Sequence, residues 1–177
     1  MSDCTVVNLP VVTADFCSPN INFGQIKTLY LGNSGNPLTD WTDLAEWNTK
    51  IDNADTADAA KIKKLHVIGD KPSPERGTVE FSQGRTAYTT PEHTINFRID
   101  ETDDNNYALI QFLEANAGQT IQVWYEGGKY LYGGNTGVSA TIVLDDIIPE
   151  SDEELNTFNG TIVWEGNHPA RILSPLA

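Results

Sequence analysis

The chain has 177 residues, 20% of them charged and 39% hydrophobic, which is an ordinary composition for one globular domain. Its 25 acidic residues outnumber its 11 Lys and Arg residues, so the formal net charge is −14. This charge argues against specific nucleic-acid binding and against an anionic membrane surface, because both need clustered cations. No apolar run approaches the roughly 20 residues of a membrane span, and the start lacks the pattern of a signal peptide, so we expect synthesis in the cytosol.

The first 23 residues are predicted to form an arm or an opening strand, because Pro10 and Pro19 interrupt their short apolar pieces. Residues 24–177 are predicted to form a single domain. The two cysteines, Cys4 and Cys17, both lie in the predicted arm. Cytosolic synthesis favours free thiols over a disulfide between them.

A short helix is predicted near residue 44. Leu44, Trp47 and Ile51 fall at i, i+3 and i+7, which places them on one helical face. Asp40 or Asp43 can cap its start.

Strands are predicted over most of the remaining chain, from β-branched or alternating runs separated by turn residues. They span residues 25–32, 63–69, two runs within 78–88, 93–100, two aromatic-rich runs on either side of 126–129, 137–146 and 159–166. Residues 53–64 are predicted to extend the first helix or to form another helical turn, and the residues after 166 to form a tail. The resulting fold class is mainly β: an antiparallel β-sandwich or barrel with one packed α-helix and a second short helix.

An acidic cluster precedes the strongest helical pattern. Tyr107, Ile110 and Leu113 recur at helical spacing, and Gly118 stands where a left-handed residue ends a helix. Residues 101–106 (ETDDNN) therefore fall at the N-cap and first turn, where carboxylates accept bonds from free N–H groups. We expect Phe112 and Leu113 to be buried against the sheet.

Two other interpretations of the cluster are weaker. A calcium loop needs a mid-loop glycine and a distant bidentate Glu, and this segment has neither. Paired catalytic carboxylates would need partners that the sequence does not supply. We therefore interpret the cluster as a helix start.

Candidate catalytic and cofactor-binding residues are scarce. His66, His93 and His168 share no metal-ligand spacing, and no cysteine lies near them in sequence. The glycines of residues 126–137 do not fit a dinucleotide-binding pattern. We expect a protein that is not an enzyme and holds no cofactor or metal.

Aromatic side chains offer a carbohydrate-binding alternative, because a flat group of them can stack on sugar rings. Two of the tryptophans fall within predicted strands, which favours core and interface positions instead. The residues concerned are Trp41, Trp47, Trp124, Tyr125, Tyr130, Tyr132 and Trp164.

A cationic projection is predicted in this acidic chain. Residues 69–77 form a loop rich in Pro and Gly, and residues 79–88 form a hairpin. The anionic surface of a second copy is a natural electrostatic partner, and prolines lower the entropy that a loop loses on docking. The predicted interface residues are Lys71, Pro72, Pro74, Arg76 and Arg85.

The order of elements from residue 78 onward resembles the major tail (tail tube) proteins of bacteriophages. The matching features are the strand, capped helix and stop of residues 93–118, the strand of residues 120–128, and the final stretch of residues 138–166. In that last stretch an acidic connection separates two strands, and the second ends in Glu-Gly. Residues 1–60 contribute nothing to the resemblance.

The resemblance implies a β-sandwich with one packed helix and a homo-oligomeric ring, hexameric in the family. Rings stack into a tube through which DNA passes, so the expected location is the virion, with other virion proteins as partners. An auxiliary or decoration protein on a phage capsid is the alternative, because such proteins reuse related sandwiches. A strongly anionic subunit suits a tube that conducts DNA without binding it.

Overall fold

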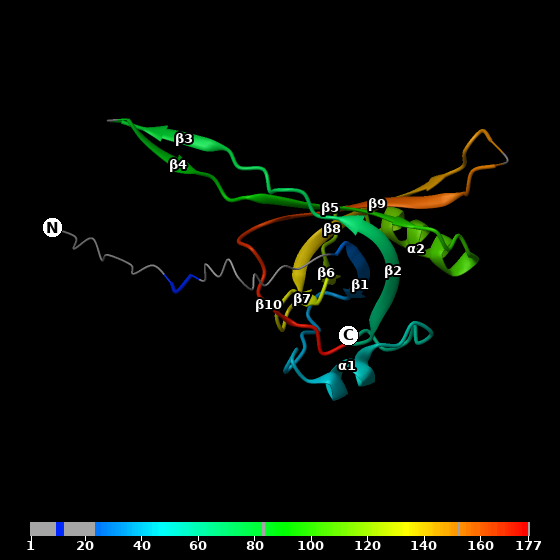
Figure 1. Ribbon diagram of the computed structural model, residues 1–177. Helices are drawn as coiled ribbons and strands as arrows, with labels where there is room; N and C mark the ends of the chain where they lie inside the picture. The colour runs from blue at the N-terminus through cyan, green and yellow to red at the C-terminus, as the bar shows by residue number, and fades with distance from the viewer. Residues whose placement is uncertain (1–9, 13–23, 83, 152, 177) are drawn as a thin grey trace, which may run out of the picture.

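The computed structural model describes residues 10–12, 24–82, 84–151 and 153–176 (Figure 1). Apart from residues 10–12, the predicted arm lies outside these ranges. Cys4 and Cys17 lie outside them too, so their pairing stays a prediction.

A barrel of six antiparallel strands forms the body of the protein. Neighbouring strands pair in turn, and the last pairs with the first, which closes the sheet. The strands, in order around the barrel, are β1 (Ile26–Gly32), β2 (Ile62–Asp70), β5 (Glu92–Ile99), β9 (Thr157–Glu165), β8 (Val138–Ile147) and β6 (Ile121–Gly127). The predicted mainly β, antiparallel fold is confirmed.

The other elements extend or cover this barrel. β7 (Tyr130–Tyr132) pairs with β6, and β10 (Arg171–Leu173) pairs with β7. β3 (Thr78–Phe81) and β4 (Arg85–Tyr88) form the predicted hairpin as a separate two-stranded sheet. The helices are α1 (Leu44–Lys50) and α2 (Asp104–Ala115). The tail prediction was wrong in part, because β10 lies within the supposed tail.

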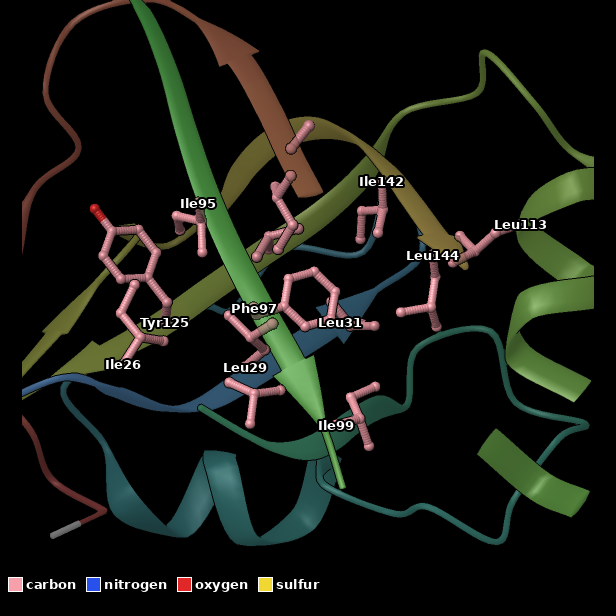
Figure 2. Packing of buried hydrophobic residues seen from close by; sticks show 14 of the residues in the cluster. Ile26, Leu29, Leu31, Ile95, Phe97, Ile99, Leu113, Tyr125, Ile142 and Leu144 are labelled. Atoms are coloured by element: carbon pink, nitrogen blue, oxygen red, sulfur yellow. The ribbon is translucent and has the colours of Figure 1, made fainter. Parts of the chain in front are cut away.

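The barrel interior contains the larger of two hydrophobic clusters (Figure 2). β5 shows the predicted alternation: Ile95, Phe97 and Ile99 all point inward and are buried. Phe97 pairs with Gly160 of β9, and a Cβ at Gly160 would overlap the Phe97 ring. The glycine in the middle of β9 therefore makes room for an aromatic side chain of the core.

A second cluster lies outside the barrel wall, under α1. Leu29 and Leu31 of β1 belong to the interior, whereas Tyr30 between them belongs to this outer cluster. The ring centre of Tyr30 lies 5.2 Å from that of Trp47 in α1. The Trp47 ring in turn meets the ring of Trp124 in β6 edge-on, with the two ring centres 5.7 Å apart. β1 and β6 are therefore apolar on both faces, because each separates two cores.

The glycine-rich loop after β7 encloses Trp124. The indole N–H of Trp124 donates to the Gly134 carbonyl at 2.8 Å. Gly133 and Gly137 have positive φ values of 138° and 68°, and a Cβ at either would overlap the indole ring. These glycines are explained by close packing and backbone conformation, not by a ligand.

Helix α1 begins at the predicted position, directly after Asp43, and ends at Lys50. Asp43 is the N-cap, and its side chain accepts from the Ala45 N–H at 2.8 Å. The predicted continuation into residues 53–64 was wrong. Asp52, just before that segment, and Asp55 within it each accept two hydrogen bonds from the backbone N–H groups two and three residues later in the chain, and such local bonds compete with helix formation.

Helix α2 confirms the interpretation of the acidic cluster. Asp103 is the N-cap, and its side chain accepts from the Asn106 N–H at 2.8 Å. Gly118 has the expected left-handed conformation, with φ of 85°. Leu113 is only 8% exposed, but Phe112 is 50% exposed, so the prediction that both are buried was wrong for Phe112. The buried face is defined by Ile110 and Leu113, and Phe112 is turned about 100° away from Leu113 around the helix.

Leu113→Ala is expected to lower the free energy of unfolding by about 2–5 kcal/mol, because it removes a buried side chain that packs toward the barrel core. Phe112→Ala is the matched control on the same helix and should cost less than about 1 kcal/mol. Urea denaturation followed by circular dichroism measures both. Equal losses would mean that α2 does not pack as described.

Candidate assembly surface

The predicted projection is an extension of two barrel strands. β2 and β5 pair up to Asp70 and Asn96, and Glu75 and Glu92 then exchange two backbone hydrogen bonds of 2.9 Å. The Thr89 N–H donates to Gly77 O at 2.9 Å, and β3 and β4 continue the ladder. Figure 1 shows this hairpin reaching far beyond the barrel. We call residues 71–82 and 84–91 the arm, as distinct from the N-terminal arm predicted for residues 1–23.

Pro72 and Pro74 fall where the ladder is interrupted, between Asp70 and Glu75. Neither proline has an N–H to donate, so a gap in the pairing is expected there. Their fixed φ angles restrict the arm's base to few conformations.

The two faces of the arm differ in chemistry. Residues that pair directly across an antiparallel ladder share a face. Val79 pairs with Ala87, and Phe81 pairs with Arg85, so these four residues share one face, which we call the apolar face of the arm. The other face carries Thr78, Glu80, Thr86 and Tyr88. Phe81 is 56% exposed on the first face and Tyr88 is 72% exposed on the second.

The structure separates the predicted interface residues into two groups. Arg76 and Arg85 are exposed on the arm, and among the described residues neither forms an ion pair. Lys71 is half-buried at the arm's base, where its Nζ lies 3.1 Å from His93 Nδ1 and 5.6 Å from the centre of the Trp164 ring. No local pattern indicated that Lys71 would turn back onto the barrel. That these residues contact another subunit stays a prediction.

His93 is fully buried at the barrel end beside this lysine. Its Nε2 lies 3.0 Å from the Gly166 carbonyl, and its ring stacks on Trp164 with centres 4.9 Å apart. Because a carbonyl can only accept and an ammonium can only donate, a neutral His93 with its proton on Nε2 satisfies both contacts. Burial, together with the positive charge of Lys71, lowers the pKa of His93 below its ordinary value of 6.5. Burial also lowers the pKa of Lys71.

The aromatic side chains considered for sugar stacking are mostly internal. Trp47, Trp124, Tyr125 and Trp164 are buried in the two clusters. The remaining three are half-buried, and Arg171 lies 4.7 Å over the ring of Tyr130. These residues do not form an exposed aromatic platform.

An open hollow of about 770 Å³ lies at the same end of the barrel as the arm. Tyr125 and Tyr132 line it and stack with ring centres 4.8 Å apart. Lys71, His168 and Arg171 also line it, which gives a mixed aromatic and cationic wall. The ring centres of His93 and His168 lie 4.8 Å apart. The spacing of these residues in the sequence did not indicate this contact.

The described ranges contain no group of three His, Cys, Asp or Glu side chains that could hold a metal ion. Neither described helix is long and apolar enough to cross a membrane.

The chain matches no protein-family model, no curated protein and no solved structure. Function is therefore inferred from the fold and from the arm.

Stability is expected to fall as the pH is lowered from about 7.5 to 5.5. The folded pKa of His93 lies below 6.5, so in this window the unfolded chain binds more protons than the folded chain, and the free energy of unfolding rises with pH. His93→Gln should reduce this slope, measured by thermal melts across the window. The carboxylates of Asp40, Glu46 and Asp55, whose pKa values are lowered, affect stability only at lower pH. An unchanged slope in the variant would exclude His93 as the source.

Arg76→Glu with Arg85→Glu is expected to leave the monomer folded, because both side chains are exposed, and to block assembly by putting negative charge on the arm. Salt should weaken wild-type assembly, because it screens the attraction between the arginines of the arm and an anionic partner surface. Lys61→Glu with Lys64→Glu is the matched control, since it changes the net charge equally at the opposite end of β2 from the arm. Sedimentation velocity and negative-stain microscopy provide the measurement. Normal assembly of the arm variant would remove these residues from the contact.

Proposed function

We propose that this chain is a non-enzymatic structural subunit of a bacteriophage virion that self-assembles, as a tail tube protein forming stacked rings. The observation that supports self-assembly is the arm. A two-stranded hairpin alone is marginally stable in water, and this one exposes Val79, Phe81 and Tyr88 to solvent. Exposed apolar residues grouped on a projecting element are typical of a protein interaction surface.

The ladder of the arm supports the same proposal. Within the described residues neither β3 nor β4 pairs with a third strand, so both hairpin edges keep unpaired N–H and C=O groups. Open edges are usually covered or blunted in proteins that stay monomeric. A subunit interface would satisfy both the apolar side chains and these backbone groups.

The order of elements supports the tail tube assignment within this class. The strand, capped helix and strand that carry the resemblance correspond to β5, α2 and β6, and α2 packs against β8. A net charge of −14 on each subunit, repeated around a ring, would create a wall that repels DNA. The proposed partners are further copies of the chain, in a ring that the resemblance implies is hexameric, and other virion proteins.

Negative-stain microscopy and sedimentation velocity of the purified chain over a wide concentration range test this proposal. Rings or tubes are the expected result. Monomers at every concentration would contradict self-assembly. Monomers that bind only to a preformed phage capsid would instead favour the decoration protein.

A further inference from the structure

Charge is distributed unequally along the strand direction of the barrel. The arm leaves the sheet at Glu92, where β5 begins, whereas the connection between β8 and β9 leaves it beyond Ile99, where β5 ends. β5 has 8 residues, so the two projections are separated by roughly 26 Å of strand. Figure 1 shows them pointing away from the barrel in opposite directions.

At the end opposite the arm, α2, β8, β9 and the connection between the two strands carry acidic residues and no Lys or Arg, whereas the lysines of that end, Lys61, Lys63 and Lys64, lie at the start of β2. The chain has no Lys or Arg from residue 99 to 128 or from 130 to 170, which covers α2, β8 and β9. Arg98, at the edge of this region, is paired with Asp100 at 2.7 Å. We call this surface the acidic end: the connection between β8 and β9 (residues 148–151 and 153–156) together with the exposed carboxylates beside it. Besides the paired Asp100, these carboxylates are Glu101, Asp103, Asp104, Asp145, Asp146, Glu150, Glu153 and Glu154.

The acidic end also exposes large apolar side chains. Ile148 is 72% exposed and Leu155 is 78% exposed, and Ile147 at the end of β8 is exposed as well. The opening of α2 lies beside the same strands, since the rings of Tyr107 and Phe158 are 6.3 Å apart. The acidic end therefore combines apolar contact area with carboxylates.

The apolar face of the arm has the complementary chemistry. It presents Val79 and Phe81 with Arg85 and no carboxylate, since Glu80 lies on the other face. An arginine beside apolar groups can form bidentate bonds to a carboxylate while its neighbours bury apolar area. Each surface carries a single sign of charge. Two copies of the same surface would therefore repel each other, whereas the two different surfaces attract.

We infer that the apolar face of the arm of one subunit docks on the acidic end of the next subunit. This inference rests on the proposed self-assembly and specifies the contact that drives it. Because the two surfaces are different and lie at opposite ends of the molecule, the contact is head-to-tail. Repetition of such a contact gives a closed ring or an open filament, not a symmetric dimer.

A charge exchange tests this contact. Arg85→Glu reverses the charge on the apolar face of the arm. Glu150→Lys with Glu153→Lys reverses two of the charges on the acidic end. Each variant alone should sediment as a monomer at concentrations where the wild type is assembled. The chain that combines all three substitutions should assemble again, because opposite charges face each other once more.

An equimolar mixture of the two separate variants adds a second test of the pairing. The intact arm of the second variant can dock on the intact acidic end of the first, and the reversed arm of the first can dock on the reversed acidic end of the second. The mixture should therefore form assemblies in which the two variants alternate, although each variant alone stays monomeric. Glu80→Lys with Glu114→Lys changes net charge as much as the acidic-end variant but lies on the other face of the arm and late in α2. It should assemble like the wild type.

The outcomes separate the two proposals. A wild type that stays monomeric overturns both the proposed function and this contact. A wild type that assembles, with the acidic-end variant assembling equally well or the combined variant remaining monomeric, overturns this contact alone. A mixture of the two separate variants that stays monomeric would also overturn this contact.

Discussion

Closure of the barrel by β1 and β6 is the contact on which the rest of the structure depends. It joins residues 26–32 to residues 122–127, almost a hundred positions later in the chain. Without it the sheet would be open, and the side chains inside it would lose one wall. The outer cluster holds the same seam from outside, because Tyr30 and Trp124 belong to the two closing strands and Trp47 lies across them. The arm and the acidic end extend from the barrel that this seam closes.

Local patterns in the sequence were sufficient for much of the fold. The alternation in β5 and the acidic residues before α2 specify their structures through effects that act within a few residues: side-chain period, capping and the helix dipole. The hairpin of β3 and β4 was predicted in the same way, from two β-prone runs around a glycine. The candidate assembly surface could therefore be placed on a hairpin before its surroundings were known.

Features set by distant residues could not be predicted. β1 alternates in sequence, but the pairing shifts between Ile26 and Thr28, and α1 covers its outer face, so both faces are buried. The exposure of Phe112 depends on which side of α2 meets the barrel. Lys71 was grouped with the arm because it is close in sequence, yet it contacts His93 and Trp164, which are 22 and 93 positions away. No short window contains that information.

Because the arm continues two barrel strands, the changes in its length that the fold can tolerate are restricted. Side chains alternate between faces along a strand, so adding or removing one residue between Asp70 and Thr78 would exchange the faces of β3. Val79 and Phe81 would then point where Glu80 now points. Exposed loops usually tolerate changes in length. Here the tolerated changes should come in steps of two residues, with Pro72 and Pro74 limiting how far the base could twist to compensate for an odd one.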